Sequence, residues 1–376
     1  MQGWMIALII IACAVAILAI AFIVGALVAV HAILGRRKEF TDRQKAKKGY
    51  DARSFGVNVA WFDGVKDVTE TLKLTAYDGV ELCAYLIKQR ESKGRAAICC
   101  HGYGANPRSM QAQAKIFYDR GFDVLLPAMR GHCESGGKVG MAWIDRFDLL
   151  RWIDKIISRF GQNVSIALCG VSMGGATVVA AAGMNPPSQV KCVIDDCGFS
   201  SQYDEYRACL GRVPLPASVA LLPLAVGVRI VHGYSIADAD ITKLAKNITL
   251  PALFIHGEKD RFVPFELGKK LFDACGSSDK RLVAVPNAAH ACSYVVDPAA
   301  YVEAFTEFVD KNIRGSAFEF DSDELIPERP SDAQEAPTVE ADNAADENPR
   351  SDAQQPEAQA RPDDALTDGS DDGASA

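Results

Sequence analysis

The stretch "LCGVSMGGAT", residues 168–177, places a serine between two glycines, after a short apolar run and before a run of small residues. Ser172 is thus the centre of a Gly-x-Ser-x-Gly pattern with Gly170 and Gly174. Between a strand and a helix, such a serine lies on a strained turn that exposes its hydroxyl, and the glycines let the strand and the helix approach closely. The pattern alone is common, so the sequence around it decides whether Ser172 is a nucleophile or part of an incidental turn.

Strand and helix patterns alternate on both sides of this stretch. Two extended segments in 71–88 flank Asp78-Gly79, which indicates a hairpin. Short apolar runs predict strands at 95–100, 122–127, 163–170, 190–195, 251–257 and 281–286, and helical spacing predicts helices at 109–121, 141–161, 173–183, 265–275 and 298–313. This alternation predicts an α/β fold, with a mostly parallel sheet covered by helices on both faces and the hairpin antiparallel at one edge.

One interval, from about residue 198 to 248, interrupts the alternation. It shows no clear strand pattern and contains the apolar, proline-bearing run "VPLPASVALLPLAVGVRIVHGYS". Because a plain connection is rarely this long, we expect an inserted helical cap over the strand ends. A second membrane-contacting patch is the alternative interpretation of the same residues.

The strand ends supply the groups that acyl-transfer chemistry needs. A serine hydroxyl requires a base, and His290, which follows the last strand, is the only histidine downstream of every candidate acid. Asp260 follows the strand at 251–257 and is the predicted acid. Asp195, Asp196 and Glu258 remain alternatives for that role.

The other histidines have different expected roles. His101 and His256 each precede a glycine at a strand end, where a histidine more often braces a loop than transfers a proton. The remaining three are His31 at the end of the apolar N-terminal stretch, His132 in "RGHCESGG" and His232 in the cap interval.

A developing oxyanion needs two preorganised N–H donors. The backbone N–H of Met173 follows the serine at the start of a helix, and the N–H of Tyr103 in "HGYG" is the predicted second donor. The Tyr103 side chain is expected either to shape an acyl pocket or to pack on the cap.

The first 35 residues contain no Asp, Glu, Lys or Arg. About 20 apolar residues suffice to span a bilayer as a helix, so residues 1–35 are predicted to be a transmembrane anchor. A cleaved signal peptide, with "VHA" at 30–32 as its cleavage site, is the competing interpretation. The basic start and short apolar region typical of signals are missing.

The residues after this span are basic. Eight Lys and Arg residues lie between 36 and 53, whereas none precedes the span. Such an excess marks the cytoplasmic side, so the catalytic domain is expected in the cytoplasm, with an extracytoplasmic domain as the alternative. The eleven cysteines are an odd number without the paired CxxC spacing of zinc sites, which fits buried free thiols in a reducing compartment.

The chain ends in an acidic segment. Residues 316–376 contain 18 Asp and Glu residues against 3 Arg, a net charge of −15, so the rest of the chain carries +7 of the total of −8. Few apolar residues and low complexity predict a disordered tail whose partner the sequence does not identify. The predicted organisation is an anchor at 1–35, a basic juxtamembrane linker at 36–65, a folded domain at 66–315 and this tail.

Taken together, these motifs resemble the α/β-hydrolase superfamily, and most of all its membrane-anchored bacterial serine hydrolases of the serine aminopeptidase-like and monoacylglycerol lipase-like group. The resemblance covers residues 66–314 and rests on "HGYGAN", "MRGHCESGG", "GVSMGG", "HGYS", "LFIHGEKDRFVP" and "AAHA". It implies hydrolysis of an ester, thioester or amide. The usual strand-4 motif places an aspartate before Arg-Gly-His-Gly, whereas here Pro127-Ala128-Met129 precede the arginine and Cys133 replaces the last glycine.

The sequence therefore predicts a serine hydrolase with an α/β-hydrolase fold, a helical cap and an N-terminal transmembrane helix. The predicted triad is Ser172, Asp260 and His290, acting on an acyl ester or lipid as a carboxylesterase or lipase would. The alternatives are a membrane-tethered serine peptidase, a non-catalytic scaffold that binds partners through the acidic tail, and, more remotely, a dehalogenating enzyme. We expect no cofactor, no metal and no nucleic-acid partner.

Overall fold

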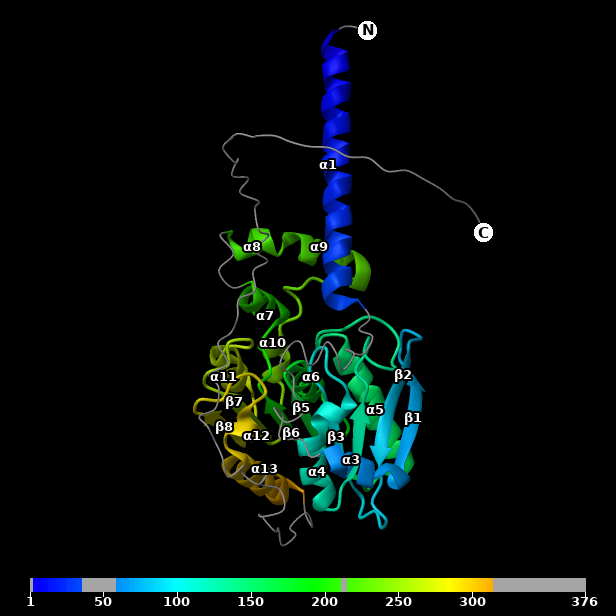
Figure 1. Ribbon diagram of the computed structural model, residues 1–376, viewed down its shortest axis with the longest axis vertical. Coiled ribbons are helices and arrows are strands. Elements are labelled where there is room, and N and C mark those ends of the chain that lie inside the picture. The colour runs from blue at the N-terminus through cyan, green and yellow to red at the C-terminus, as the bar shows by residue number, and fades with distance from the viewer. Residues whose placement is uncertain (1–2, 36–58, 211–214, 314–376) are drawn as a thin grey trace, which may run out of the picture. The chain divides into compact units, whose positions relative to one another are not determined.

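The structure is a computed structural model that describes residues 3–35, 59–210 and 215–313 (Figure 1). Most of the predicted juxtamembrane linker and the whole predicted acidic tail lie outside the described residues.

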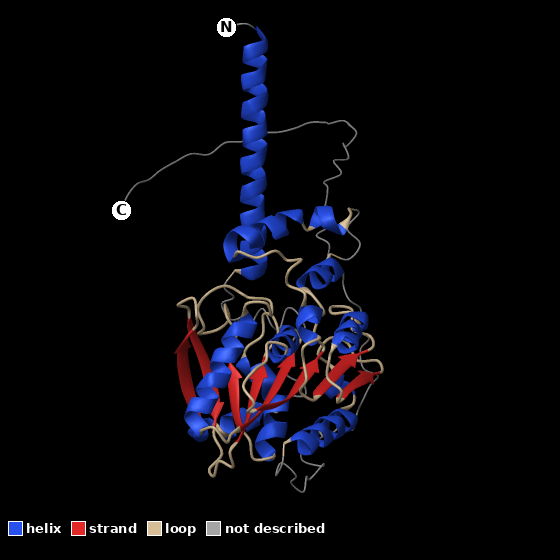
Figure 2. Cartoon of the chain, turned by 180° about the vertical axis from the view of Figure 1, so that it is seen from behind, coloured by secondary structure: helices blue, strands red, loops and turns tan. Residues whose placement is uncertain are grey.

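An eight-stranded sheet forms the centre of the folded domain (Figures 1 and 2). Its strands, in the spatial order β1-β2-β4-β3-β5-β6-β7-β8, are β1 (Thr69–Thr75), β2 (Glu81–Ile87), β3 (Arg95–Cys100), β4 (Asp123–Pro127), β5 (Ser165–Val171), β6 (Val190–Asp196), β7 (Ala252–Gly257) and β8 (Lys280–Val285). The β1–β2 hairpin pairs antiparallel with itself and with β4, and all other neighbours are parallel. The predicted mostly parallel sheet with an antiparallel edge hairpin is confirmed.

Helices cover both faces of this sheet, and others lie beyond it. The helices of the folded domain are α3 (Val59–Gly64), η2 (Lys66–Val68), η3 (Pro107–Met110), α4 (Gln111–Asp119), α5 (Asp145–Phe160), α6 (Met173–Ala182), α7 (Gln202–Cys209), α8 (Ala217–Ala220), α9 (Leu222–His232), α10 (Ile241–Ala245), α11 (Phe265–Ala274), α12 (Ser293–Val296) and α13 (Pro298–Asn312). Those beyond the sheet include α8 and α9, which lie next to the N-terminal helix (Figure 1). One apolar core includes side chains of α5, α6, α10 and α11, and a second includes side chains of α3, α4, α12 and α13.

Strand β3 shows why the sheet needs cover on both faces. All six of its residues are buried. Ala96, Ile98 and Cys100 belong to one core, while Ala97 and Cys99 belong to the other. Alternate side chains of a strand point to opposite faces, so a continuous apolar run can fill both cores at once.

One predicted helix boundary was wrong. The apolar spacing predicted a helix from residue 141, but α5 begins at Asp145. Met141 and Ala142 have φ angles of 46° and 67°, which lie in the left-handed region and cannot continue an α-helix. The Asp145 carboxylate instead accepts a hydrogen bond of 2.8 Å from the Ala142 N–H and so holds a turn in front of the helix.

The interval between β6 and β7, here called the cap segment (residues 198–248), is helical. Its described residues form α7, α8, α9 and α10. An isolated antiparallel β-bridge between Ser201 and Asp240 joins residues near the two ends of this segment. Residues 211–214 within it lie outside the described part of the chain.

The N-terminal helix α1 (Gly3–Leu34) is long and apolar enough to cross a membrane, a test of length and composition that a signal sequence also passes. Its residues 3–25 are exposed, and its buried residues are Ala26, Val30 and Leu34, which recur every four positions on one side of its C-terminal part. This side contacts α9 of the cap segment (Figure 1).

Candidate active site

Ser172 occupies the sharp turn between β5 and α6. Its φ and ψ angles are 58° and −119°, a combination that an L-residue adopts only at a cost. The Ser172 N–H donates a 2.8 Å hydrogen bond to the Asp196 carbonyl, which ties the turn to the end of β6. The predicted strand–turn–helix context of the serine is therefore present.

Steric contacts explain why both residues that flank this turn are glycines. A Cβ at Gly170 would overlap the carbonyl oxygen of Gly174, and a Cβ at Gly174 would overlap the carbonyl oxygen of Cys100. Strand β5, helix α6 and strand β3 thus approach one another more closely than any side chain permits. The Gly-x-Ser-x-Gly spacing is required by this packing.

The structure brings Ser172, His290 and Asp260 together from three separate loops. His290 Nε2 lies 2.9 Å from Ser172 Oγ, and His290 Nδ1 lies 2.7 Å from Asp260 Oδ2. The three groups therefore form one continuous line from hydroxyl to imidazole to carboxylate, which is the arrangement that a serine nucleophile with a base and an orienting acid requires.

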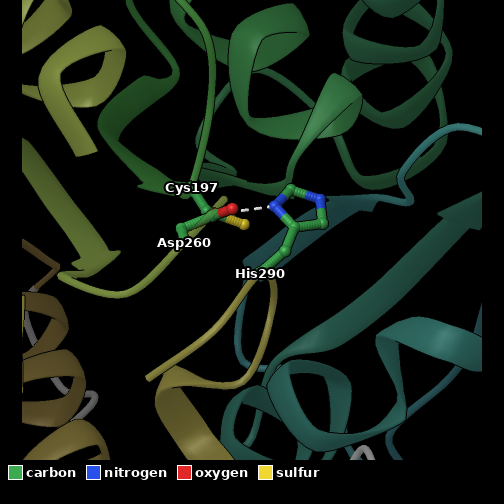
Figure 3. A group of neighbouring side chains, drawn as sticks. All are labelled: Cys197, Asp260 and His290. Carbon is green, nitrogen blue, oxygen red and sulfur yellow. Dashed lines mark hydrogen bonds and ion pairs between the residues drawn. The ribbon is translucent and has the colours of Figure 1, made fainter. Parts of the chain in front are cut away.

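Asp260 is buried and accepts hydrogen bonds from several donors, of which Figure 3 shows the one from His290. Its Oδ1 accepts hydrogen bonds of 2.9 Å from the Phe262 and Val263 N–H groups. Its Oδ2 also lies 3.5 Å from His256 Nε2. Burial raises the pKa of the Asp260 carboxyl, but the hydrogen bonds from His256 and His290 outweigh this and lower the pKa to about 2. Asp260 is therefore a carboxylate at neutral pH.

The three alternative acids lie elsewhere. Asp195 accepts a hydrogen bond from the Gly198 N–H, and Asp196 accepts one of 2.9 Å from the Tyr301 hydroxyl. Burial raises the pKa of Asp195 to about 7 and that of Asp196 to about 6. Glu258 is exposed. Of the four candidates, Asp260 is the one that is hydrogen-bonded to the His290 ring in the described part of the chain.

Two other histidines hold backbone groups beside the site. His101 Nε2 accepts a 3.0 Å hydrogen bond from the Met129 N–H, and His132 Nε2 accepts one of 2.9 Å from the Gly104 N–H. Burial lowers the pKa of His101 to about 3, which keeps its ring neutral and able to accept. These contacts fit a loop-bracing role.

The loop after β3 passes directly beside the serine. A Cβ at Gly102 would lie 3.2 Å from Ser172 Cβ and 3.7 Å from Ser172 Oγ, so the backbone at Gly102, just before Tyr103, lies beside the serine. Met173, on the other side, is the first residue of α6, where backbone N–H groups have no partner within the helix. The two predicted oxyanion donors thus belong to backbone segments next to Ser172.

The Tyr103 side chain reaches the apolar N-terminal helix. Its hydroxyl donates a 2.5 Å hydrogen bond to the carbonyl of Ile33 in the last turn of α1. The neighbouring Leu34 carbonyl accepts a 2.9 Å bond from the Val139 N–H. Neither expected role of this side chain, acyl pocket or contact with the cap, included the apolar helix.

Cys197 completes a group of potential metal ligands with Asp260 and His290 (Figure 3). The three ligand atoms lie within 4.8 Å of one another. However, zinc binds a thiolate, and burial raises the pKa of the Cys197 thiol well above its usual range. His290 Nδ1 is already engaged by Asp260. The donor set fits a hydrogen-bonded triad better than a metal centre.

The altered strand-4 motif has a structural explanation. Cys133, at the position where the family usually has glycine, has a φ angle of 48°. The loop therefore keeps the left-handed backbone that glycine adopts easily. Arg130 in the same motif forms hydrogen bonds with both carboxylate oxygens of Asp148 and of Asp78, which fastens this loop to α5 and to the β1–β2 turn.

Sequence reasoning missed two residues of this site. His256 was expected to brace a loop, and it does contact the Val263 carbonyl at 2.9 Å, but it also lies against the Asp260 carboxylate. Ile33 was treated only as part of an apolar span. A histidine four positions before a candidate acid, at a strand end, was the one signal available for His256.

Known proteins support the same fold. The profile of the family described as "Serine aminopeptidase, S33" matches residues 92–198 and 221–294. The uncharacterised protein YqkD of Bacillus subtilis (strain 168) is 28% identical over 305 residues, which cover 78% of this chain and 96% of YqkD. The thermostable monoacylglycerol lipase of Bacillus sp. (strain H-257) is 23% identical over 57% of this chain and 90% of the lipase.

Among solved structures, the Pyrococcus furiosus esterase Pf2001 superimposes with a TM-score of 0.54 at 19% identity and covers 66% of this chain and 95% of the esterase. The chain belongs to the α/β-hydrolase superfamily, as the sequence motifs predicted.

Proposed function

We propose that this protein is a serine hydrolase that cleaves an acyl ester through a covalent acyl-enzyme. The observation that carries the proposal is the line from Ser172 Oγ through the His290 ring to Asp260 Oδ2, with contacts of 2.9 and 2.7 Å. A serine hydroxyl is a weak nucleophile without such a base.

Ser172 Oγ attacks the acyl carbonyl while His290 Nε2 takes the hydroxyl proton. Asp260 orients the ring through Nδ1 and stabilises the imidazolium that forms, without taking the proton itself. The protonated Nε2 then gives its proton to the leaving alcohol, and a water molecule releases the acyl group by the same steps in reverse. The carboxylate can act in this way because its pKa is about 2.

The N–H groups of Tyr103 and Met173 would stabilise the oxyanion of the tetrahedral intermediate. The first follows Gly102, whose backbone lies against Ser172, and the second begins α6. The positive end of the helix dipole adds to the second donor. Removing one such donor typically costs about 10²–10³ in kcat.

A lipid or other acyl ester is the substrate class that we favour. The cap segment is rich in apolar residues, and the apolar helix α1 contacts it. A relative that matches most of its own length is a monoacylglycerol lipase. The alternative, a membrane-tethered peptidase, draws on the description of the matching family as serine aminopeptidase.

We further propose that α1 anchors the enzyme in a membrane with the catalytic domain on the cytoplasmic side. The exposed apolar residues of α1 and the basic residues that follow it in the sequence support this orientation.

A fluorophosphonate activity probe tests the nucleophile. The wild-type chain should be labelled and should lose hydrolysis on labelling, whereas Ser172→Ala should show neither labelling nor hydrolysis. Ser188→Ala, which removes an exposed serine in a loop, is the matched control and should behave as wild type. Labelling of Ser172→Ala at the wild-type rate would remove Ser172 from the mechanism.

The substrate class is tested separately with p-nitrophenyl esters of increasing chain length and with aminoacyl p-nitroanilides. A kcat/KM that rises at least tenfold from acetate to a long-chain ester supports the lipid substrate. Cleavage of the amides alone would assign the enzyme to the peptidases.

A further inference from the structure

Helices α1 and α9 cross in direct contact at a glycine. A Cβ at Gly227 of α9 would overlap the carbonyl oxygen of Ala26 and the side chain of Val30 in α1. Small residues permit this kind of close backbone approach between helices, and membrane helices use it often. Gly227, Ala26 and Val30 are all buried. The contact therefore fixes α9 at one level along α1.

That level coincides with the end of a bilayer-length segment. Residues 3–25 of α1 are exposed, and Ala26 is the first buried residue after them. At 1.5 Å per residue these exposed turns are roughly 34 Å long, against about 30 Å for the hydrocarbon core of a bilayer. If α1 spans a membrane, the surface of that membrane lies at α9.

The outward side of α8 and α9 is apolar at this same level. Leu215, Val219, Leu222 and Ile230 are between 49% and 55% exposed. Val219 lies in α8, Leu222 and Ile230 lie in α9, and Leu215 lies just before α8. No acidic residue occurs between 215 and 232, and the only Lys or Arg there is Arg229, which is exposed. Apolar side chains with an exposed cation are typical of segments that lie in a membrane interface.

We propose that Leu215, Val219, Leu222 and Ile230 form an interfacial surface that lies in the headgroup–acyl boundary of the leaflet next to the catalytic domain. Its occupant is the lipid bilayer, because α8 and α9 lie beside α1 (Figure 1) and both the exposed part of α1 and the exposed residues of this surface are apolar. This inference rests on the proposed membrane insertion of α1 and does not depend on hydrolysis.

The surface has a consequence for the proposed reaction. The cap segment is held to α1 through Gly227, and the loop beside Ser172 is held to the same helix through the Tyr103 hydroxyl and the Ile33 carbonyl. The membrane helix thus contacts both the cap and the loop beside the nucleophile.

Bromolipid quenching of introduced tryptophans tests the surface. Full-length Leu222→Trp, Ile230→Trp and Val296→Trp chains, each also carrying Ser172→Ala, are reconstituted in phosphatidylcholine–phosphatidylglycerol vesicles with bromine at a shallow or a deep acyl position. Val296, on α12, is a matched exposed apolar residue outside the proposed surface. The Ser172→Ala chain without an added tryptophan gives the fluorescence and quenching of the native tryptophans. The change in quenching when Trp4→Phe is added to that chain reports whether α1 is inserted in the membrane.

If the surface lies in the headgroup–acyl boundary, the fluorescence of tryptophans introduced at 222 and 230 should be quenched at least twice as strongly by shallow as by deep bromine. The fluorescence of a tryptophan introduced at 296 should not be quenched. Quenching of Trp4 without quenching at 222 and 230 would overturn the surface while leaving the anchor in place. Absence of quenching at Trp4 would overturn both. A concentration-dependent dimer that shields positions 222 and 230 from bromine would assign the surface to a second copy of the chain instead.

Discussion

At the scale of single residues, Asp260 combines burial with an unusually complete set of donors. Two backbone N–H groups bind one carboxylate oxygen, and His290 and His256 approach the other. These contacts fix both the charge of Asp260 and the ring of His290. His290 is thereby held with Nδ1 as the donor and Nε2 free to accept the proton of Ser172.

Asp260→Asn should lower kcat by about 10³–10⁴-fold, because an amide can present an N–H to His290 Nδ1 and favour the wrong tautomer. The KM should change much less, and the melting temperature should remain within a few degrees. Steady-state kinetics on a short-chain p-nitrophenyl ester measure the effect. Glu258→Gln alters an exposed acid two residues away and should leave kcat unchanged; an equal loss in both variants would contradict the assignment of Asp260.

Glu205 in α7 is a buried acid whose Oε2 has no hydrogen-bond partner among the described residues. Burial raises its pKa from 4.5 to about 8. A folded-state pKa above the unfolded value means that the stability from the protonated form is complete below pH 4.5 and is lost as the pH rises toward 8.

Glu205→Gln, which keeps the shape and removes the titration, should therefore raise the free energy of unfolding at pH 7.5 by on the order of 2 kcal/mol and change it little at pH 4.5. Thermal unfolding of the full chain in detergent at both pH values measures this. Glu303→Gln, on the exposed side of α13, is the control. A gain of the same size at both pH values would show that ionisation of Glu205 is not its cause.

At the scale of elements, the turn that carries Ser172 depends on the close packing of β5, α6 and β3. The serine projects from this turn because its neighbours have no side chains to separate the three backbones. The same packing makes the turn intolerant of change.

Gly174→Ala should destabilise the protein by about 3 kcal/mol or more, since the new methyl group would overlap the Cys100 carbonyl and overpacking of a core is costly. The melting temperature of the full chain measures the loss. Gly64→Ala is the matched control, because a Cβ there meets no atom within 4 Å. A Gly174→Ala chain as stable as Gly64→Ala would mean that β3 and α6 are not packed as closely as described.

Loss of the Tyr103–Ile33 hydrogen bond should affect catalysis more than binding. Tyr103→Phe removes the bond that holds the loop beside Ser172 to α1, and one such bond contributes about 0.5–1.5 kcal/mol. We expect kcat to fall by roughly 2- to 10-fold with little change in KM. Tyr77→Phe, at an exposed tyrosine, should have no effect. An equal fall in kcat for Tyr103→Phe and Tyr77→Phe, or a change in the KM of Tyr103→Phe without a change in its kcat, would contradict a role for the loop beside Ser172.

At the scale of the whole molecule, charge is divided unevenly along the chain. The predicted tail carries −15, against +7 for residues 1–315. Deletion of residues 316–376 should leave kcat/KM for a neutral ester within about twofold of the full chain at 0.15 M salt, where charges beyond about 8 Å are largely screened. Loss of hydrolysis in the shortened chain would favour a role for the tail in the active enzyme.

The sequence determined the elements and the candidate residues of the site. Apolar runs predicted the strands from β3 to β8, and the Asp78-Gly79 turn predicted the β1–β2 hairpin, because strand periods and turn residues are local properties. The Ser172, Asp260 and His290 candidates followed from their places at strand ends. Parallel strands end at a common edge, so residues 118 positions apart, such as Ser172 and His290, were expected near one another.

Only the tertiary structure decided what surrounds these residues. The position of His256 against Asp260, the hydrogen bond between Tyr103 and Ile33 and the start of α5 at Asp145 depend on how loops and helices pack in three dimensions. Tyr103 and Ile33 are 70 residues apart and show no shared pattern in the sequence. Periodicity specifies which face of an element is apolar, but it does not specify which side chain of another element meets that face.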